Sequence, residues 1–124
     1  MAPERSTLQK LRDAQSYNRS IIEASSIALL VVDANLRVTD ANERATALTH
    51  RPRQELIGSP IDAEFDFSPR SMAVARKTLE TGESSRFELV VSPRSGKARS
   101  VAVSASRFID PMGEHRGIFL IDTL

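Results

Sequence analysis

The sequence predicts an α+β fold: a five-stranded antiparallel sheet with short helices on one face and a further helix at the N-terminus. Two short apolar segments separated by a turn occupy residues 28–40. Residues 42–82 contain helix-forming segments with capping signals, and residues 86–121 contain three strand-like segments separated by turns. Strands joined by short turns pair antiparallel, so these strands form one sheet whose helices cover one face.

The chain has 124 residues, which is enough for one domain with a buried core. We divide it into a helical lead-in, residues 1–16, and a folded domain, residues 17–124, because polar residues give way to apolar ones at this point. In the lead-in, Ser6 stands three residues before Gln9, which is the spacing of a capping box. The apolar stripe of this helix is thin, so the helix needs a partner surface.

The composition argues against several classes of protein. The chain contains no Cys, so it has no disulfide, no thiolate metal site and no Cys nucleophile. Its 17 basic and 16 acidic residues are dispersed, whereas nucleic-acid binders gather basic residues on one face. No apolar run comes close to the length of a membrane-spanning helix, which is about 18 residues. We therefore expect a cytoplasmic protein whose partner is neither a nucleic acid nor a membrane.

The first two strands are predicted at residues 28–32 and 36–40. The first is a short apolar run that ends in β-branched residues, and the second alternates apolar and polar residues. Asn35 lies in the turn between them, where Asn tolerates a positive φ. Asn42 is a favoured N-cap, so residues 43–49 are predicted as a short helix.

Two further helices follow. Pro52 suits the first turn of a helix that ends before Gly58. Ser68 followed by Pro69 marks the start of the longest helix, and Gly82 marks its end.

Three strands complete the sheet. Residues 86–91 and 101–106 alternate along their length, and residues 117–121 form a last apolar strand. Turns with Gly at residues 92–96 and 110–113 join them.

Several short motifs stand in a fixed order along the chain. They are the strand–turn–strand of residues 30–42, Asn42-Glu43-Arg44-Ala45, the R-x-E-L-I-G segment of residues 53–58, Gly96, the D-x-x-G turn from Asp110 to Gly113, and the closing Asp122-Thr123. In order and spacing this set resembles the PAS family of sensory domains, over residues 17–123. The resemblance implies a module of a larger bacterial signalling protein, as in two-component systems. It also implies a module that is not itself an enzyme and that biases an attached output domain.

The residues predict neither a catalytic nor a metal site. His50 is expected at a helix end and His115 in a turn, and neither has an evident nucleophile and orienting partner. Asp62, Glu64 and Asp66 alternate as in a calcium loop but lack its Gly and its distal Glu. The alternative of a small α+β enzyme requires a polar cleft that these residues do not assemble.

Flavin and haem are both disfavoured as cofactors. Flavin-binding light sensors of the family use a reactive Cys and hold the flavin with polar side chains, at positions where this chain has Val91, Val101 and Leu120. Haem-binding members place a His on the long helix, and residues 70–81 contain none.

The interior is apolar, and two interpretations of it remain open. A core filled by side chains is favoured, and the alternative is a cavity for a small apolar metabolite such as a fatty-acyl chain. The expected lining residues of such a cavity are Phe65, Met72, Phe87, Leu89, Val91, Val101, Val103 and Leu120.

The opposite face of the sheet is predicted as an interface. With Leu120 pointing inward, Phe119 and Ile121 point outward and form an apolar patch of the kind that partners cover. We expect the N-terminal helix to cover it, from the second copy in a homodimer or, alternatively, from the same chain in a monomer. The expected interface residues are Leu8, Leu11, Ile22, Val90, Ala102, Phe119 and Ile121.

Two functions follow from these expectations. The first is a sensory module that acts through homodimerisation and binding of a small apolar ligand. The alternative is a dimerisation module with a filled core and no ligand.

Overall fold

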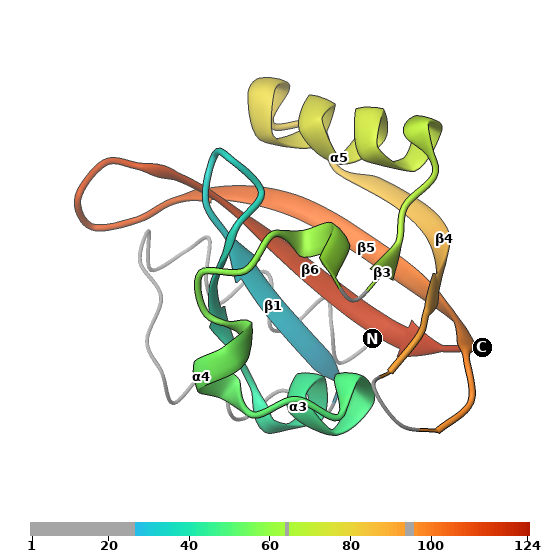
Figure 1. Ribbon diagram of the computed structural model, residues 1–124. Coiled ribbons are helices and arrows are strands. Elements are labelled where there is room, and N and C mark those ends of the chain that lie inside the picture. Colours follow the sequence, from blue (N-terminus) through green and yellow to red (C-terminus); the bar gives the residue numbers. More distant parts are fainter. Residues whose placement is uncertain (1–26, 64, 94–95) are drawn as a thin grey trace.

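The computed structural model describes residues 27–63, 65–93 and 96–124, so the expected N-terminal helix lies outside the described residues. Figure 1 shows a curved sheet with helices packed against it. In chain order the elements are β1 (Ala28–Val32), β2 (Val38–Ala41), α3 (Glu43–Thr49), α4 (Arg53–Leu56), the short 3-10 helix η1 (Ile61–Ala63), β3 (Phe65–Asp66), α5 (Pro69–Thr81), β4 (Ser85–Val91), β5 (Arg99–Ile109) and β6 (His115–Thr123).

The sheet is antiparallel, as predicted, and its strand order is β2-β1-β6-β5-β4-β3. It has six strands rather than the expected five, because Phe65 and Asp66 pair with Val91 and Val90 as a short edge strand. β1 pairs with β2 on one side and with β6 on the other, so the first and last strands of the described chain lie side by side.

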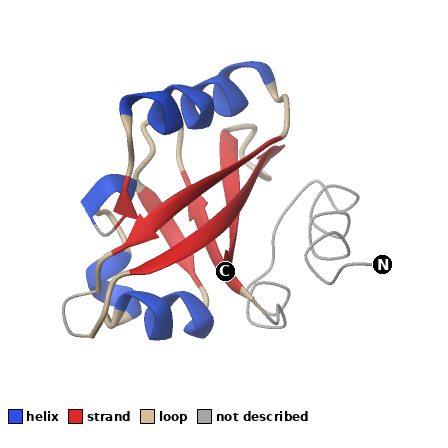
Figure 2. Cartoon of the chain, turned by 90° about the vertical axis from the view of Figure 1, so that its right-hand side faces the viewer, coloured by secondary structure: helices blue, strands red, loops and turns tan. Residues whose placement is uncertain are grey.

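Helices α3, α4 and α5 lie along one side of the sheet (Figure 2). Between them and the sheet lies the main hydrophobic core, to which all six strands contribute. This is the expected α+β arrangement. It forms because β4 and the start of β5 carry apolar residues at every second position on the side that faces the helices.

Asn42 begins α3 and also holds the start of β1. Its side-chain oxygen accepts hydrogen bonds from the backbone N–H groups of Ala45 and Leu29, both at 3.0 Å. Its amide donates to the carbonyl of Ile27 at 2.9 Å. The predicted N-cap is therefore confirmed, and the same buried side chain joins the helix to the sheet.

The longest helix begins and ends where the sequence predicts. The Ser68 hydroxyl accepts from the N–H of Ser71 at 3.0 Å, and Pro69 occupies the first helical position. Gly82 ends α5 with a φ of +80°, and its N–H donates to Thr78 at 2.9 Å. A side chain at a φ of this kind is strained, so Gly suits the position.

Helix α4 is held to β2 by an ion pair. The Arg53 guanidinium donates to one oxygen of Asp40 through Nε at 3.0 Å and Nη2 at 2.8 Å. The same oxygen accepts from the N–H of Ala41 at 2.8 Å. Asp40 is buried, so this pairing satisfies a carboxylate that would otherwise be costly to remove from water.

The prediction for the faces of β6 is wrong. Ile121 pairs with Val103, and Phe119 pairs with Ala105, and directly paired residues share a face of an antiparallel sheet. Phe119 and Ile121 therefore belong to the main core, whereas Leu120 points to the other face. Every residue from 118 to 121 is apolar, so the sequence gives no alternation from which to read the register.

Candidate functional site

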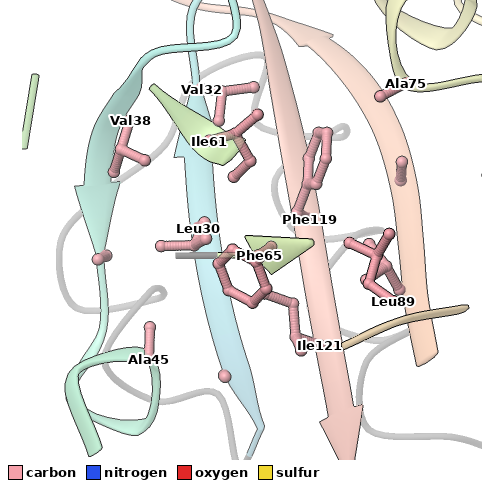
Figure 3. Close-up of a cluster of buried hydrophobic side chains, with 14 of the residues drawn as sticks. Leu30, Val32, Val38, Ala45, Ile61, Phe65, Ala75, Leu89, Phe119 and Ile121 are labelled. Carbon is pink, nitrogen blue, oxygen red and sulfur yellow. The ribbon is translucent and has the colours of Figure 1, made fainter. Parts of the chain in front are cut away.

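The interior between the sheet and the helices is closely occupied by side chains. Figure 3 shows the rings of Phe65 and Phe119 among the side chains of Leu30, Leu89 and Ile121. Each of these five residues exposes 5% or less of its surface. These side chains come from four strands, β1, β3, β4 and β6, so the core joins strands from both halves of the sheet.

Three aromatic rings extend from this core toward the surface. The rings of Phe119 and Phe87 meet edge to face, with centroids 6.4 Å apart and planes at 81°. The ring centroids of Phe87 and Phe67 lie 6.1 Å apart. Such tilted contacts are favourable for aromatic pairs. Phe67 and Phe87 are only partly buried, so the edge of the core is at β4 and the segment before α5.

Seven of the eight predicted lining residues face this interior. Met72 and Phe87 are partly buried against the core, and Leu120 is the exception because it lies on the opposite face of the sheet. The other five are buried within the core and are Phe65, Leu89, Val91, Val101 and Val103. Their role in binding a ligand stays a prediction.

The opposite face carries a second apolar cluster, which we call the outer cluster. Its members lie on β1, β5 and β6 and expose at most 5% of their surface, although α3, α4 and α5 lie on the other face. They are Leu29, Val31, Phe108, Ile118 and Leu120, with Ile27 partly buried against them. Leu29, Val31 and Ile118 were not predicted as members of this face. The uninterrupted apolar runs in β1 and β6 were the available signal, since such runs are typical of strands buried on both faces.

The predicted interface residues divide between the two faces. Val90 and Ala102 lie outward as expected, Val90 with 36% of its surface exposed and Ala102 buried. Phe119 and Ile121 lie in the core instead. Leu8, Leu11 and Ile22 lie outside the described residues.

The turn between β5 and β6 is organised by Asp110. One carboxylate oxygen accepts from the N–H groups of Met112 and Glu114, both at 2.9 Å, and the other accepts from Arg116 Nε at 2.9 Å. The hydrogen bond from Glu114 is the main cause that lowers the pKa of the Asp110 carboxyl, with Arg116 adding to it and burial opposing it. Gly113 completes the turn with a φ of +84°.

Arg107 joins this hairpin to the end of α5. Its Nη1 donates to the carbonyls of Leu79 at 3.2 Å and Glu80 at 3.1 Å, and it lies 3.4 Å from Nδ1 of His115. These carbonyls lie at the negative end of the helix dipole, where a cation is favourable. Arg107 therefore links the β5–β6 hairpin to the C-terminal end of α5 by hydrogen bonds.

The two histidines stand in structural positions. His50 ends α3 with a φ of +57°, and His115 begins β6 beside Arg107. Within residues 27–63, 65–93 and 96–124, no group of three or more His, Cys, Asp or Glu could hold a metal ion. No helix in this part of the chain is long and apolar enough to cross a membrane.

A family model described as the PAS fold matches residues 16–121. Among curated proteins, the signal transduction histidine-protein kinase AtoS of Escherichia coli (strain K12) is 28% identical over 113 residues. The match covers 91% of this chain but only 18% of the kinase, so the chain spans less than a fifth of that relative.

Solved structures agree with this fold. The PAS domain of an HTR-like protein from Haloarcula marismortui matches with a TM-score of 0.73 and 22% identity, over 97% of this chain and 99% of that one. The PAS domain of nitrogen regulation protein NR(II) from Vibrio parahaemolyticus matches with a TM-score of 0.70 and 15% identity, over 85% and 95% of the two chains. At identities this low, the likeness shows the fold alone.

Proposed function

The chain belongs to the PAS family, and we propose on this basis that it serves as a sensory and regulatory module within a larger signalling protein. The kinase relative, a signal transduction protein of which this chain matches a small part, supports such an arrangement. The proposed role is to bias the state of an attached output domain. The module itself is proposed to be non-catalytic, which agrees with the structural positions of His50 and His115.

The observation that carries this proposal is the outer cluster. A sheet with helices on one face normally carries polar residues on the other, yet here Leu29, Val31 and Ile118 are fully buried on it. The N-terminal segment carries Leu8 and Leu11 at helical spacing, and we assign it as the cover of this face. In the proposed homodimer the covering helices of two copies pack together, and a monomer capped by its own helix is the alternative.

Ligand sensing is the second part of the proposal. Met72, Phe67 and Phe87 are the partly buried side chains at the edge of the core, so this edge is where a small apolar molecule would enter. Flavin and haem remain disfavoured by the residue types. Bound ligand would act by its different affinity for two arrangements of the domain, because only a difference in affinity shifts such an equilibrium.

A ligand-free dimerisation module is the competing function, and one observation favours it. Leu30, Val91 and Val101 have no exposed surface, and the ring of Phe87 lies against the rings of both Phe119 and Phe67. A core of this kind stabilises one arrangement and needs no further molecule.

Native mass spectrometry of the 124-residue chain separates these functions. A dimer that retains a molecule recovered by solvent extraction supports the sensory module and identifies its ligand. A dimer without an added mass supports the dimerisation module. A monomer at all concentrations contradicts dimerisation and leaves the N-terminal segment as an intramolecular cap.

Substitutions in the N-terminal segment test the assigned cover. We expect Leu8→Ser combined with Leu11→Ser to dissociate the dimer or to lower the thermal midpoint, because both remove apolar area from the contact. Lys10→Ser, in the same segment, is the matched control and should change neither property. Equal effects of the two variants would contradict the assignment.

A further inference from the structure

An open cavity of about 270 Å³ lies at the edge of the core, where residues of α3 meet the end of β6. Its lining includes the apolar side chains of Leu48 and Ile121 and three charged residues, Arg44, Arg99 and Asp122. The charged residues sum to one net positive charge. Nothing in the proposed function uses this cavity.

The fold brings these residues together from three elements. Arg44 and Leu48 are four residues apart on α3 and so project from the same side of the helix. Arg99 begins β5 and has the same parity as the inward-facing Val101, so it extends the helix-facing side of the sheet toward α3. Ile121 lies on that side too, and it is buried. The cavity therefore has an apolar floor and two cationic side chains.

The two arginines differ from those that hold the fold together. Arg53, Arg107 and Arg116 donate hydrogen bonds to a carboxylate or to backbone carbonyls. Among the residues that the structure describes, the side chains of Arg44 and Arg99 make no hydrogen bond or ion pair. Two unpaired guanidinium groups beside an apolar surface leave their donors available for an anion.

We propose that this cavity binds a small carboxylate with an apolar body. Guanidinium groups recognise carboxylates through paired N–H donors, and the remaining apolar surface would contact Leu48 and Ile121. The volume is slightly below the range of about 300–1,000 Å³ found for drug-sized ligands, which fits a molecule of the size of an aromatic acid. Inorganic phosphate would pair with the two arginines but has no apolar part to contact Leu48 and Ile121. Because α3, β5 and β6 all contribute, the ligand would hold the helix against the end of the sheet.

The test is a titration of the 124-residue chain with benzoate at constant ionic strength. The amide chemical shifts of the chain, measured by NMR, are the readout. We expect saturable shifts at residues 44–48, 99–101 and 121–123. Arg44→Gln and Arg99→Gln should each weaken binding by about tenfold, because each removes a charge-assisted hydrogen bond. Asp122→Asn removes a negative charge from the lining, which would repel the carboxylate of the ligand, and should strengthen binding.

Matched controls distinguish specific binding in the cavity from general effects of charge and of folding. Arg76→Gln, on the exposed side of α5 and away from the cavity, should leave the benzoate affinity unchanged. Benzyl alcohol lacks the carboxylate and phosphate lacks the apolar body, so both should bind at least about tenfold more weakly than benzoate. Absence of saturable shifts, equal loss of affinity in Arg76→Gln, or equal binding of phosphate would each overturn the proposal. Since binding is read directly, these outcomes do not depend on whether the module is sensory.

Discussion

Asp110 and Arg116 form an ion pair across the turn between β5 and β6, with 2.9 Å between Oδ2 and Nε. Because the hydrogen bond from Glu114 and this ion pair lower the pKa of Asp110 in the folded state, the ionised carboxylate stabilises the fold. That stabilisation is complete above the unfolded pKa of about 3.9 and is lost as the pH falls through the lower, folded value.

We predict that Asp110→Asn lowers the urea midpoint of unfolding at neutral pH. The midpoint of the variant should also change less with pH in the acid range. In the native chain the midpoint should fall as the pH drops below about 4, and this fall should be smaller in the variant. Urea titrations followed by circular dichroism over this range measure both effects. Asp62→Asn is the control, since Asp62 is exposed and makes no hydrogen bond or ion pair within the described part of the chain. A native-like slope in Asp110→Asn would contradict the assignment.

Asn42→Ala should destabilise the domain by about 2 kcal/mol, because it removes a helix N-cap and a buried link to β1 together. The three bonds lost are those to Leu29, Ala45 and Ile27. Asn35→Ala, at an exposed turn, should stay within about 0.5 kcal/mol of the native chain. Equilibrium unfolding in urea measures the difference, and equal values for the two variants would show that Asn42 has no special role.

Phe119→Ala should cost about 3–5 kcal/mol, since it leaves a cavity in the core and removes the edge contact with Phe87. Ile109→Ala, on the same hairpin with 49% of its surface exposed, should change stability by no more than about 0.5 kcal/mol. The thermal midpoints of the two variants show on which face of the sheet the side chain of Phe119 lies. If Phe119 pointed to the outer face of the sheet, as the sequence predicts, its substitution would leave no cavity in the core and the contact with Phe87 would not be lost.

Arg107→Gln should loosen the end of α5 without unfolding the sheet. The variant loses the donors to Leu79 and Glu80, so the amide of Gly82 should exchange its hydrogen about tenfold faster. Amides in the centre of β5 should keep their native exchange rates. Arg86→Gln is the matched control, because the Arg86 guanidinium donates to the Ser104 hydroxyl at 3.3 Å and not to the end of α5. Unchanged exchange at Gly82 would show that the helix end does not depend on Arg107.

The sequence predicts local features well because their causes lie within a few residues. Ser68, Pro69 and Gly82 define α5 through caps and φ preferences that need no tertiary contact. The faces of β6 could not be predicted in this way, since they depend on its pairing with β5. The cavity at Arg44 and Arg99 was also missed, because these residues are 55 positions apart and only the fold brings them together.

The pairing of β1 with β6 also has a consequence for how the chain folds. Ala28 opposes Ile121 in this pair, so a central contact of the sheet joins residues separated by almost the whole described chain. Contacts of such high sequence separation slow folding, because a long loop must close before they form. During synthesis on the ribosome, β1 emerges long before β6, and until then the edge of β1 that β6 will cover has no partner. A nascent chain arrested before residue 115 should therefore be prone to aggregation or bound by chaperones, whatever the stability of the finished domain.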